Sequence, residues 1–351
     1  MPSSTFRLAT AFRNGRTKID DVYFEAPFKL MSPFDRGRHA DFIVMLASPG
    51  FLKGDEAHIE CTFGAGTDST IKTQSYEKVL NTDDGSASRT IDLTAQGDAK
   101  AVFLPFPVIP FEGSTFSNLS TARISPESTF VYADVVTCGR VGRGERWQMN
   151  RFSNRLRVSV DESLASDEYR RALNGDPAKT TDDPTADTTP EPAAKTAHRG
   201  RPRKQTSRSR LVFADRLLLD PTRFDYTEMG MWREYTHCGV LYAHLPETDP
   251  GYDPSALADA PASPYAASGG AAAGAKDPRL IADPRKRIEA ARVAAEDALI
   301  TRIRDYTETV KSNGFQGEFG ASRVTDGVCV RILTTRGDDA FDFIKAIADM
   351  V

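Results

Sequence analysis

The chain has 351 residues, of which 40% are hydrophobic and 27% are charged, so it can form one large globular domain or two small ones. Its net charge of −4 argues against binding nucleic acid through the whole surface, which requires a strong basic excess. Residues 1–20 lack the apolar core of a signal peptide, and no segment approaches the ~20 apolar residues of a membrane helix, so we expect a cytoplasmic protein without membrane contact.

Residues 1–160 form the first part of a predicted β scaffold. Asn14-Gly15 lies between two apolar alternations and predicts a hairpin turn. Further strands are expected at residues 41–46, 58–63, 70–73, 89–93, 101–104, 130–136 and 147–160. Short strands with regular turns between them are typical of a sandwich, a barrel or a solenoid.

Residues 161–209 differ in composition from the scaffold. They are polar and rich in proline, and large apolar side chains almost vanish after Leu173. Such a segment buries too little surface to offset the entropy of ordering it. We therefore predict a disordered insert, with a short helix around Glu168 to Leu173.

The scaffold is expected to continue over residues 210–245. Leu211 to Leu219 is a strand candidate, and Trp232 to Leu245 contains an alternating strand. Residues 246–280 include Gly269 to Gly274 and predict a flexible loop. Strands on both sides of the first insert predict one discontinuous domain.

Residues 281–351 predict a helix, a strand and a helix in the same domain. Asp283 can cap a long helix that ends at Asn313-Gly314. Its apolar stripe is expected to comprise Ile288, Ala291, Ala295, Leu299, Ile303, Tyr306 and Val310. A strand at Val328 to Leu333 and an amphipathic helix at Asp338 to Met350 follow. The predicted fold class is therefore mainly β, wound or sandwich-like, with a helical C-terminal portion.

No catalytic motif stands out. The sequence has no GxSxG elbow, no Walker loop and no HExxH pair, and the glycine-rich run from Gly139 to Glu145 is followed by no helix. We expect a protein that is not an enzyme. The four cysteines, Cys61, Cys138, Cys238 and Cys329, form no CxxC pair and are expected to be reduced thiols.

Two motifs have a functional and a structural interpretation. His237, Cys238 and His244 could bind a metal, but neighbours in a strand point to opposite faces, which favours structural packing. The segment Arg199 to Lys204 resembles an AT-hook for the minor groove of DNA. A single copy in a basic stretch is more typical of a solvated linker.

Four acidic residues near turns or inside apolar strands are candidate site residues: Asp55, Asp134, Glu145 and Asp215. A carboxylate inside a strand requires a partner or solvent. A salt bridge to Arg140 or Arg216 would satisfy this requirement. The functional interpretation is a polar channel or a path for a hard cation.

Six segments, in order along the chain, resemble motifs of the urease accessory protein family UreD, also called UreH. They are Ser48 to Asp55 (SPGFLKGD), Thr73 to Lys78 (TQSYEK), Leu104 to Phe111 (LPFPVIPF), Asp134 to Glu145 (DVVTCGRVGRGE), Leu211 to Pro221 (LVFADRLLLDP) and a closing segment made of Gly320 to Ser322 and Gly327 to Leu333. The sequence departs from the family pattern at Phe51-Leu52 and at Phe106, and neither departure affects the acidic positions.

The resemblance implies a largely β protein without catalytic activity. It implies binding to the urease apoprotein together with UreF-type and UreG-type partners, the latter a GTPase that carries nickel. No cofactor is expected to be tightly bound, and nickel(II) would be transient. The resemblance implies a nickel path, for which Asp55, Asp134, Glu145 and Asp215 are the candidate carboxylates and Gln74 a neutral polar lining.

Two other functions remain open. One is a DNA-associated protein that uses Arg199 to Lys204. The other is a β-solenoid carbohydrate-active enzyme, which would require a carboxylate or histidine cluster on adjacent coils.

Overall fold

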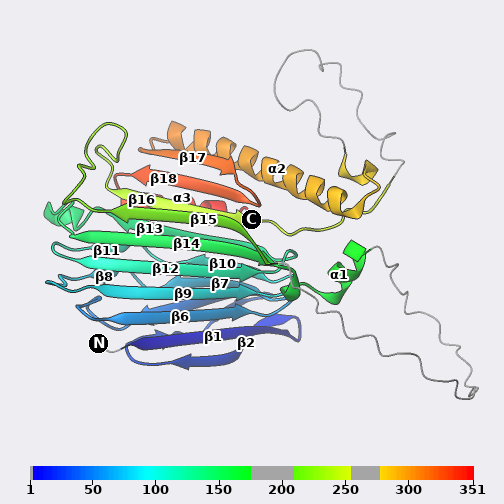
Figure 1. Ribbon diagram of the computed structural model, residues 1–351, viewed down its shortest axis with the longest axis horizontal. Helices are drawn as coiled ribbons and strands as arrows, with labels where there is room; N and C mark the ends of the chain where they lie inside the picture. Colours follow the sequence, from blue (N-terminus) through cyan, green and yellow to red (C-terminus); the bar gives the residue numbers. More distant parts are fainter. Residues whose placement is uncertain (1–2, 175–208, 254–276) are drawn as a thin grey trace, which may run out of the picture.

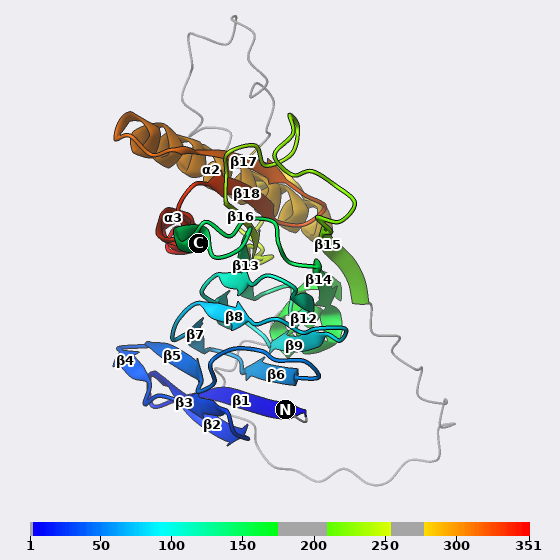
Figure 2. The ribbon, with the colours of Figure 1, turned by 90° about the vertical axis from the view of Figure 1, so that its left-hand side faces the viewer.

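The computed structural model describes residues 3–174, 209–253 and 277–351 (Figure 1). Two β-sheets face one another, and helices α2 and α3 pack on the C-terminal part of one of them (Figure 2). This arrangement confirms the predicted fold class, a mainly β protein of wound strands with a helical C-terminal portion.

Sheet A is a seven-stranded sheet. In spatial order it comprises β15 (Ser209–Leu219), β14 (Arg151–Asp161), β12 (Thr115–Ile124), β9 (Ala87–Ala95), β6 (Glu56–Phe63), β1 (Ser4–Arg13) and β2 (Arg16–Phe24).

Sheet B is an eleven-stranded sheet. Its main order is β17 (Gly317–Arg323), β18 (Val328–Thr334), β16 (His237–His244), β13 (Thr129–Thr137), β10 (Lys100–Leu104), β7 (Asp68–Thr73), β5 (His39–Leu46) and β3 (Phe28–Leu30). Three short strands pair at its side: β4 (Phe34–Arg36), β8 (Glu77–Val79) and β11 (Val108–Pro110). The α-helices are α1 (Asp167–Asn174), α2 (Pro284–Ser312) and α3 (Gly337–Ala348).

The chain winds as a solenoid between the two sheets. From β5 to β14 it passes repeatedly from one sheet to the other, with the short strands β8 and β11 following β7 and β10 within sheet B, and neighbouring strands of this part are parallel in each sheet. Successive coils are in register, so that Glu56, Ser88, Ser117 and Ser153 lie side by side in sheet A. Antiparallel strands close both ends of the solenoid: β2 on β1, and β15 and β16 on β14 and β13.

The hairpin between β1 and β2 turns at Asn14 and Gly15, as predicted. Both residues have positive φ angles, 53° and 74°. Asn and Gly tolerate this left-handed conformation, and the resulting turn matches the twist of the two strands.

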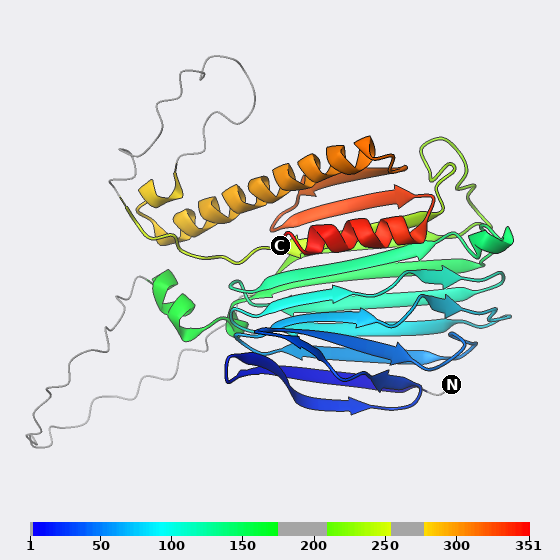
Figure 3. The same cartoon turned by 180° about the vertical axis from the view of Figure 1, so that it is seen from behind.

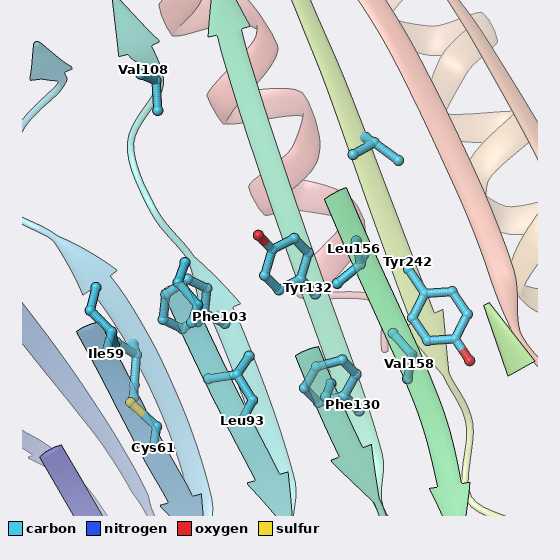
Figure 4. Close-up of a cluster of buried hydrophobic side chains, with 14 of the residues drawn as sticks. Ile59, Cys61, Leu93, Phe103, Val108, Phe130, Tyr132, Leu156, Val158 and Tyr242 are labelled. Atoms are coloured by element: carbon cyan, nitrogen blue, oxygen red, sulfur yellow. The ribbon is translucent and has the colours of Figure 1, made fainter. Parts of the chain in front are cut away.

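The main core lies between the two sheets (Figure 4). Ile59, Leu93 and Leu156 from sheet A face Phe103 and Phe130 from sheet B. Full burial of each such side chain contributes about 1.5–3 kcal/mol.

A second core lies between sheet B and the helices α2 and α3. Strand β13 contributes to both cores, because alternate residues such as Tyr132 and Val131 face opposite sides. Strand β16 likewise is buried on both faces, so the polar-apolar alternation expected there was wrong.

The start predicted for the insert, residue 161, is wrong, because regular structure continues to Asn174. Asp161 is the last residue of β14, and α1 forms where the short helix was expected. Tyr169 holds α1 in place, since it is buried and its hydroxyl donates a hydrogen bond to Glu247 over 2.6 Å. Residues 175–208, which include Arg199 to Lys204, lie outside the described residues.

The loop predicted at 246–280 also contains ordered chain at both ends. Asp249 forms an ion pair with Arg287 of α2 over 2.5 Å, and Pro278–Leu280 forms a turn of 3₁₀ helix. Residues 254–276 lie outside the described residues.

Helix α2 begins after the predicted cap, with the Asp283 carboxylate accepting a hydrogen bond from the Arg285 amide. Its buried face differs from the predicted stripe, because Ala295 is exposed whereas Arg292 and Glu296 are buried. Helical spacing of apolar residues alone cannot reveal a buried ion pair.

Two further corrections concern the segment predicted as a strand at 147–160 and the last helix. Strand β14 starts at Arg151, because Trp147 adopts a φ of 58° and stacks on Tyr226 with ring centroids 4.6 Å apart. Helix α3 begins at Gly337 and ends at Ala348, two residues before the predicted end at Met350, and it buries Phe341, Ile344, Ile347 and Ala348.

A buried ionic cluster joins α2 to the end of the solenoid. The Asp326 carboxylate, which is fully buried, lies 2.6 Å from the Arg210 guanidinium and 3.1 Å from that of Arg292. Glu296 accepts hydrogen bonds from Arg292 and from the Gly327 amide. The charges of this cluster compensate one another. Removal of one side chain therefore leaves its partners buried without full compensation of their charge.

We predict that Arg292→Met lowers the free energy of unfolding by about 3–5 kcal/mol, since it leaves Glu296 and Asp326 with one cation fewer. Urea denaturation measures this value. The matched control is Arg323→Met, which removes an exposed partner of Asp297 and is expected to cost at most about 1 kcal/mol. Equal losses in the two variants would contradict the structural role of the cluster.

Candidate functional site

Three polar side chains form a row across sheet A inside the protein. Arg89, Asn118 and Asn154 occupy one register position on β9, β12 and β14. Each lies at an inward position of its strand and is at most 6% exposed. The Arg89 Nε donates to Asn118 Oδ1 over 2.8 Å, and Asn118 Nδ2 donates to Asn154 Oδ1 over 2.6 Å. The row is therefore connected by hydrogen bonds.

Strands β8 and β13 of sheet B supply the carboxylates of Glu77 and Asp134 opposite this row. Arg89 donates a hydrogen bond to Glu77 and lies 3.9 Å from Asp134. Asp134 Oδ2 also accepts hydrogen bonds from the Tyr132 hydroxyl and from Asn154 Nδ2, the latter over 3.1 Å. One buried guanidinium is thus shared between two buried carboxylates.

The environment shifts the protonation equilibria of these groups. Burial raises the pKa of Asp134, although the charge of Arg89 and the hydrogen bonds from Tyr132 and Asn154 act in the opposite direction. Burial lowers the pKa of Arg89, but the charges of Glu77 and Asp134 outweigh this and leave its pKa raised. Arg89 is therefore a permanent cation in the cluster.

A cavity of about 20 Å³ extends from this cluster towards β15 and β18. Arg89, Asp134 and Asn154 line one part of it, and Asp215 and Arg331 another. The volume suffices for about one water molecule.

Asp215 and Arg331 form an ion pair across the side of the sandwich, from β15 to β18. The Arg331 side chain is 55% exposed, whereas that of Asp215 is 8% exposed. The ion pair therefore lies at the surface end of the cavity. Asp215 thus forms a salt bridge, as its structural interpretation predicted. The partner is Arg331 and not Arg216.

The structure thus brings together two of the predicted site residues, Asp134 and Asp215. Asp55, Gln74 and Glu145 lie elsewhere, in connections at one end of the solenoid: Asp55 between β5 and β6, Gln74 between β7 and β8, and Glu145 between β13 and β14. Asp55 is buried and accepts a hydrogen bond from the Leu52 amide over 2.8 Å. Gln74 is exposed and lines a surface pocket beside Ser48 and Tyr76.

Glu145 ties two of these connections together. Its carboxylate accepts hydrogen bonds from Arg140 and, over 2.8 Å, from the Glu112 amide. Gly139 is required beside it, because its φ is 136° and a Cβ there would lie 2.7 Å from the Glu145 carbonyl oxygen. The predicted salt bridge between Glu145 and Arg140 is confirmed.

The first motif segments stack on one another at this end. Gly50 approaches Lys78 so closely that a Cβ would lie 2.6 Å from the Lys78 carbonyl oxygen, and the Phe51 amide donates to that oxygen over 2.8 Å. The Phe106 amide donates to Thr73 Oγ1 over 2.8 Å. The ring of Phe106 stacks on Phe341 of α3, with centroids 4.3 Å apart. Segments far apart in sequence thus form one continuous end face.

The possible metal ligands in β16 do not converge. His237 is buried against Gly337, where a Cβ would lie 2.9 Å from His237 Nε2. His244 lies beside Asp326, with Nδ1 3.5 Å from Oδ1. Among the described residues, no three His, Cys, Asp or Glu side chains are placed to hold one metal ion.

Sequence reasoning missed Arg89, Glu77, Asn118, Asn154 and Arg331. The sequence did contain a signal for Arg89, because this residue occupies an inward position in the alternation of β9. An inward arginine in a buried strand requires a buried acidic partner. The identity of that partner depends on the winding of the chain and not on local sequence.

Residues 3–182 match the family model described as UreD urease accessory protein. The urease accessory protein UreH of Helicobacter pylori (strain G27) is 36% identical over 161 residues, which cover 45% of this chain and 61% of that protein. UreD of Acetivibrio thermocellus is 32% identical over 148 residues, covering 41% and 56%. UreD 2 of Streptomyces griseus is 30% identical over 169 residues, covering 46% and 58%. The aligned segments thus span about three fifths of these relatives.

In the part of the chain that the structure describes, we find no helix suited by length and apolarity to crossing a membrane.

We predict that Arg89→Met lowers the free energy of unfolding by about 3–5 kcal/mol, because it leaves Glu77 and Asp134 buried without their cation. Adding Glu77→Gln should recover part of this loss, since it removes one unpaired charge. Urea denaturation of both variants tests the coupling. A double variant less stable than the single one would show that the charges are not coupled in this way.

The burial of His237 predicts that the free energy of unfolding depends on pH. Burial lowers its pKa to about 4, against ~6.5 in an unfolded chain. Between these values the unfolded chain binds a proton that the folded chain does not, so stability falls as the pH falls from ~6.5 to about 4. We expect His237→Gln to reduce this loss by about 2–3 kcal/mol.

Unfolding free energies at pH 7 and pH 4.5 measure this difference. The matched control is the same substitution at a more exposed histidine, His58→Gln on β6, which tests whether loss of any histidine gives the same change. An unchanged pH dependence in His237→Gln would refute the assignment.

Proposed function

Because the chain belongs to the UreD family of urease accessory proteins, we propose that it is a non-catalytic scaffold that assists nickel insertion into urease apoprotein. The observation that carries the proposal is the family match over residues 3–182, which covers most of the solenoid. The stacked end face formed by the motif segments supports it, because it offers one continuous surface to a partner.

The proposed partners are the urease apoprotein and accessory proteins of the UreF and UreG types, the latter a GTPase that carries nickel. This assignment rests on the resemblance of the motif segments. A protein that joins several partners requires a rigid body, and a wound β solenoid with a packed interior supplies one.

We further propose that Asp134 and Asp215 contribute to a path for nickel. Carboxylates and water bind Ni²⁺ more weakly than a cage of imidazole and thiolate ligands, so an ion held by them exchanges readily. Arg89 beside Asp134 favours transit over storage, because its positive charge repels a divalent cation.

The size of the cavity sets a condition on this path. A cavity of about 20 Å³ has room for about one water molecule and not for an ion with its full hydration shell. An ion must therefore exchange waters for carboxylate oxygens. The ion pair between Asp215 and Arg331 must separate at the surface end.

We predict that Asp134→Asn and Asp215→Asn reduce the nickel content and activity of urease severalfold, because each removes a negative charge from the cavity. Both are measured on urease purified after coexpression. The control is Asp84→Asn, at a side chain that is 87% exposed. Glu145 is not used, since its loss would disturb the connections that it ties together.

Copurification of the variants with urease apoprotein separates loss of docking from loss of transfer. The path predicts normal copurification with reduced nickel. Normal nickel content in both variants would refute the path and leave the scaffold role intact.

The DNA-binding alternative is tested by a deletion with revised boundaries. Removal of 175–208 retains α1 and β15, which a deletion of 161–209 would damage. A scaffold should still activate urease after this deletion. If the deletion abolished both DNA binding and urease activation, the result would favour the alternative.

A further inference from the structure

The outer face of sheet B carries a second, unassigned polar site. Helix α3 packs on β13, β16 and β18, and Val102 and Leu104 of β10 are buried in the second core beside it. Beyond them, the helix leaves the outer face of β7 and β5 uncovered (Figure 3). The strand register places Arg36, His39, Asp68 and Lys100 in one row across β4, β5, β7 and β10. Four ionisable side chains thus lie side by side on this face.

This row borders a cavity of about 340 Å³. Asp41, Thr70 and Lys72 form its floor on β5 and β7, and Lys345 and Asp349 line it from the end of α3. The volume is far larger than the ~10–15 Å³ that one water molecule needs. The cavity can hold a small organic ion.

Most charges around the cavity are paired with one another. His39 Nδ1 lies 2.7 Å from Asp68 Oδ1, Lys72 Nζ lies 3.0 Å from Asp41, and Lys345 Nζ lies 2.7 Å from Asp349. In contrast, Arg36 and Lys100 have no carboxylate within 4.0 Å among the described residues. These two cations remain available to a ligand.

The balance of charge favours an anion. Four Lys or Arg side chains and His39 face three carboxylates, Asp41, Asp68 and Asp349. The hydrogen bond to Asp68 is the main factor that raises the pKa of His39. The C-terminal end of α3 acts against an anion through its helix dipole, and Lys345 in its last turn offsets this effect.

We propose that this cavity binds a small oxyanion, a phosphate or carboxylate group, through Lys100 and Arg36. Lysine and arginine form charge-assisted hydrogen bonds with such oxygens, and Thr70 on the floor adds a hydroxyl. The site is separate from the inter-sheet cavity and does not depend on the proposed function.

Isothermal titration calorimetry of the full chain at pH 7 tests the proposal, with inorganic phosphate and malonate as probes and sodium chloride at matched ionic strength as the blank. We expect saturable binding of at least one probe at one site per chain. Tighter binding of phosphate identifies a phosphate-bearing ligand, and tighter binding of malonate identifies a carboxylate-bearing one. Absence of saturable binding for both probes would overturn the proposal.

Variants locate the site. Lys100→Gln and Arg36→Gln should each weaken binding of the preferred probe at least tenfold, and both positions lie at the surface, where substitution leaves the core intact. The matched control is Lys53→Gln, at an exposed lysine paired with Asp84 on another part of the molecule. Unchanged binding in both cavity variants, or equal weakening in the control, would place the anion elsewhere and refute the assignment.

Discussion

The buried guanidinium of Arg89 is the constraint on which the arrangement of the two sheets depends. Its side chain is 1% exposed and lies inside a core that is otherwise largely apolar. A buried charge is tolerated only with partners of opposite charge and satisfied hydrogen bonds. Glu77, Asp134 and Asn118 supply these partners from β8, β13 and β12, so the winding of the chain must bring all three strands to the same level.

The same polar row gives the protein its internal cavity. An interior filled by apolar side chains at native packing density would leave no polar space between the sheets. Here Asp134 at the inner end and Asp215 at the surface end face a space that holds about one water molecule. The feature that makes the core costly to assemble is also the one that supports a proposed route for a metal ion.

The solenoid explains why motif segments distant in sequence act together. Each coil brings its connection to the same end, where Gly50 contacts Lys78 and Glu145 contacts Glu112. The helices then fix the other face of sheet B, with Phe341 of α3 stacked on Phe106 of that end. The two sheets and the helices packed on them therefore carry an end face, an internal cavity and an outer polar cavity.

The ordered flanks of the two segments outside the described residues meet at one place. Tyr169 before the first segment and Arg210 after it both contact Glu247, which precedes the second. Arg210 also contacts Asp326, and Arg292 of α2 shares that carboxylate. These contacts hold the described chain on both sides of each segment.

Local sequence determined the elements of this protein. Alternation predicted the inner strands, Asn14-Gly15 predicted the hairpin, and Asp283 and Asn313 marked the ends of α2, because each rule acts over a few neighbouring residues. The family resemblance of six segments was also visible in the sequence, and it correctly indicated a wound β fold.

Only the tertiary structure decided which charges meet. Asp134 and Asp215 were named from sequence, but their partners Arg89 and Arg331 were not, and Asp55, Gln74 and Glu145 lie away from their cavity. Likewise Arg292 and Glu296 replaced Ala295 on the buried face of α2. The reason is physical: ion pairs between distant segments depend on strand register and coil length, which sum over the whole chain, whereas turns and caps depend on the residues beside them.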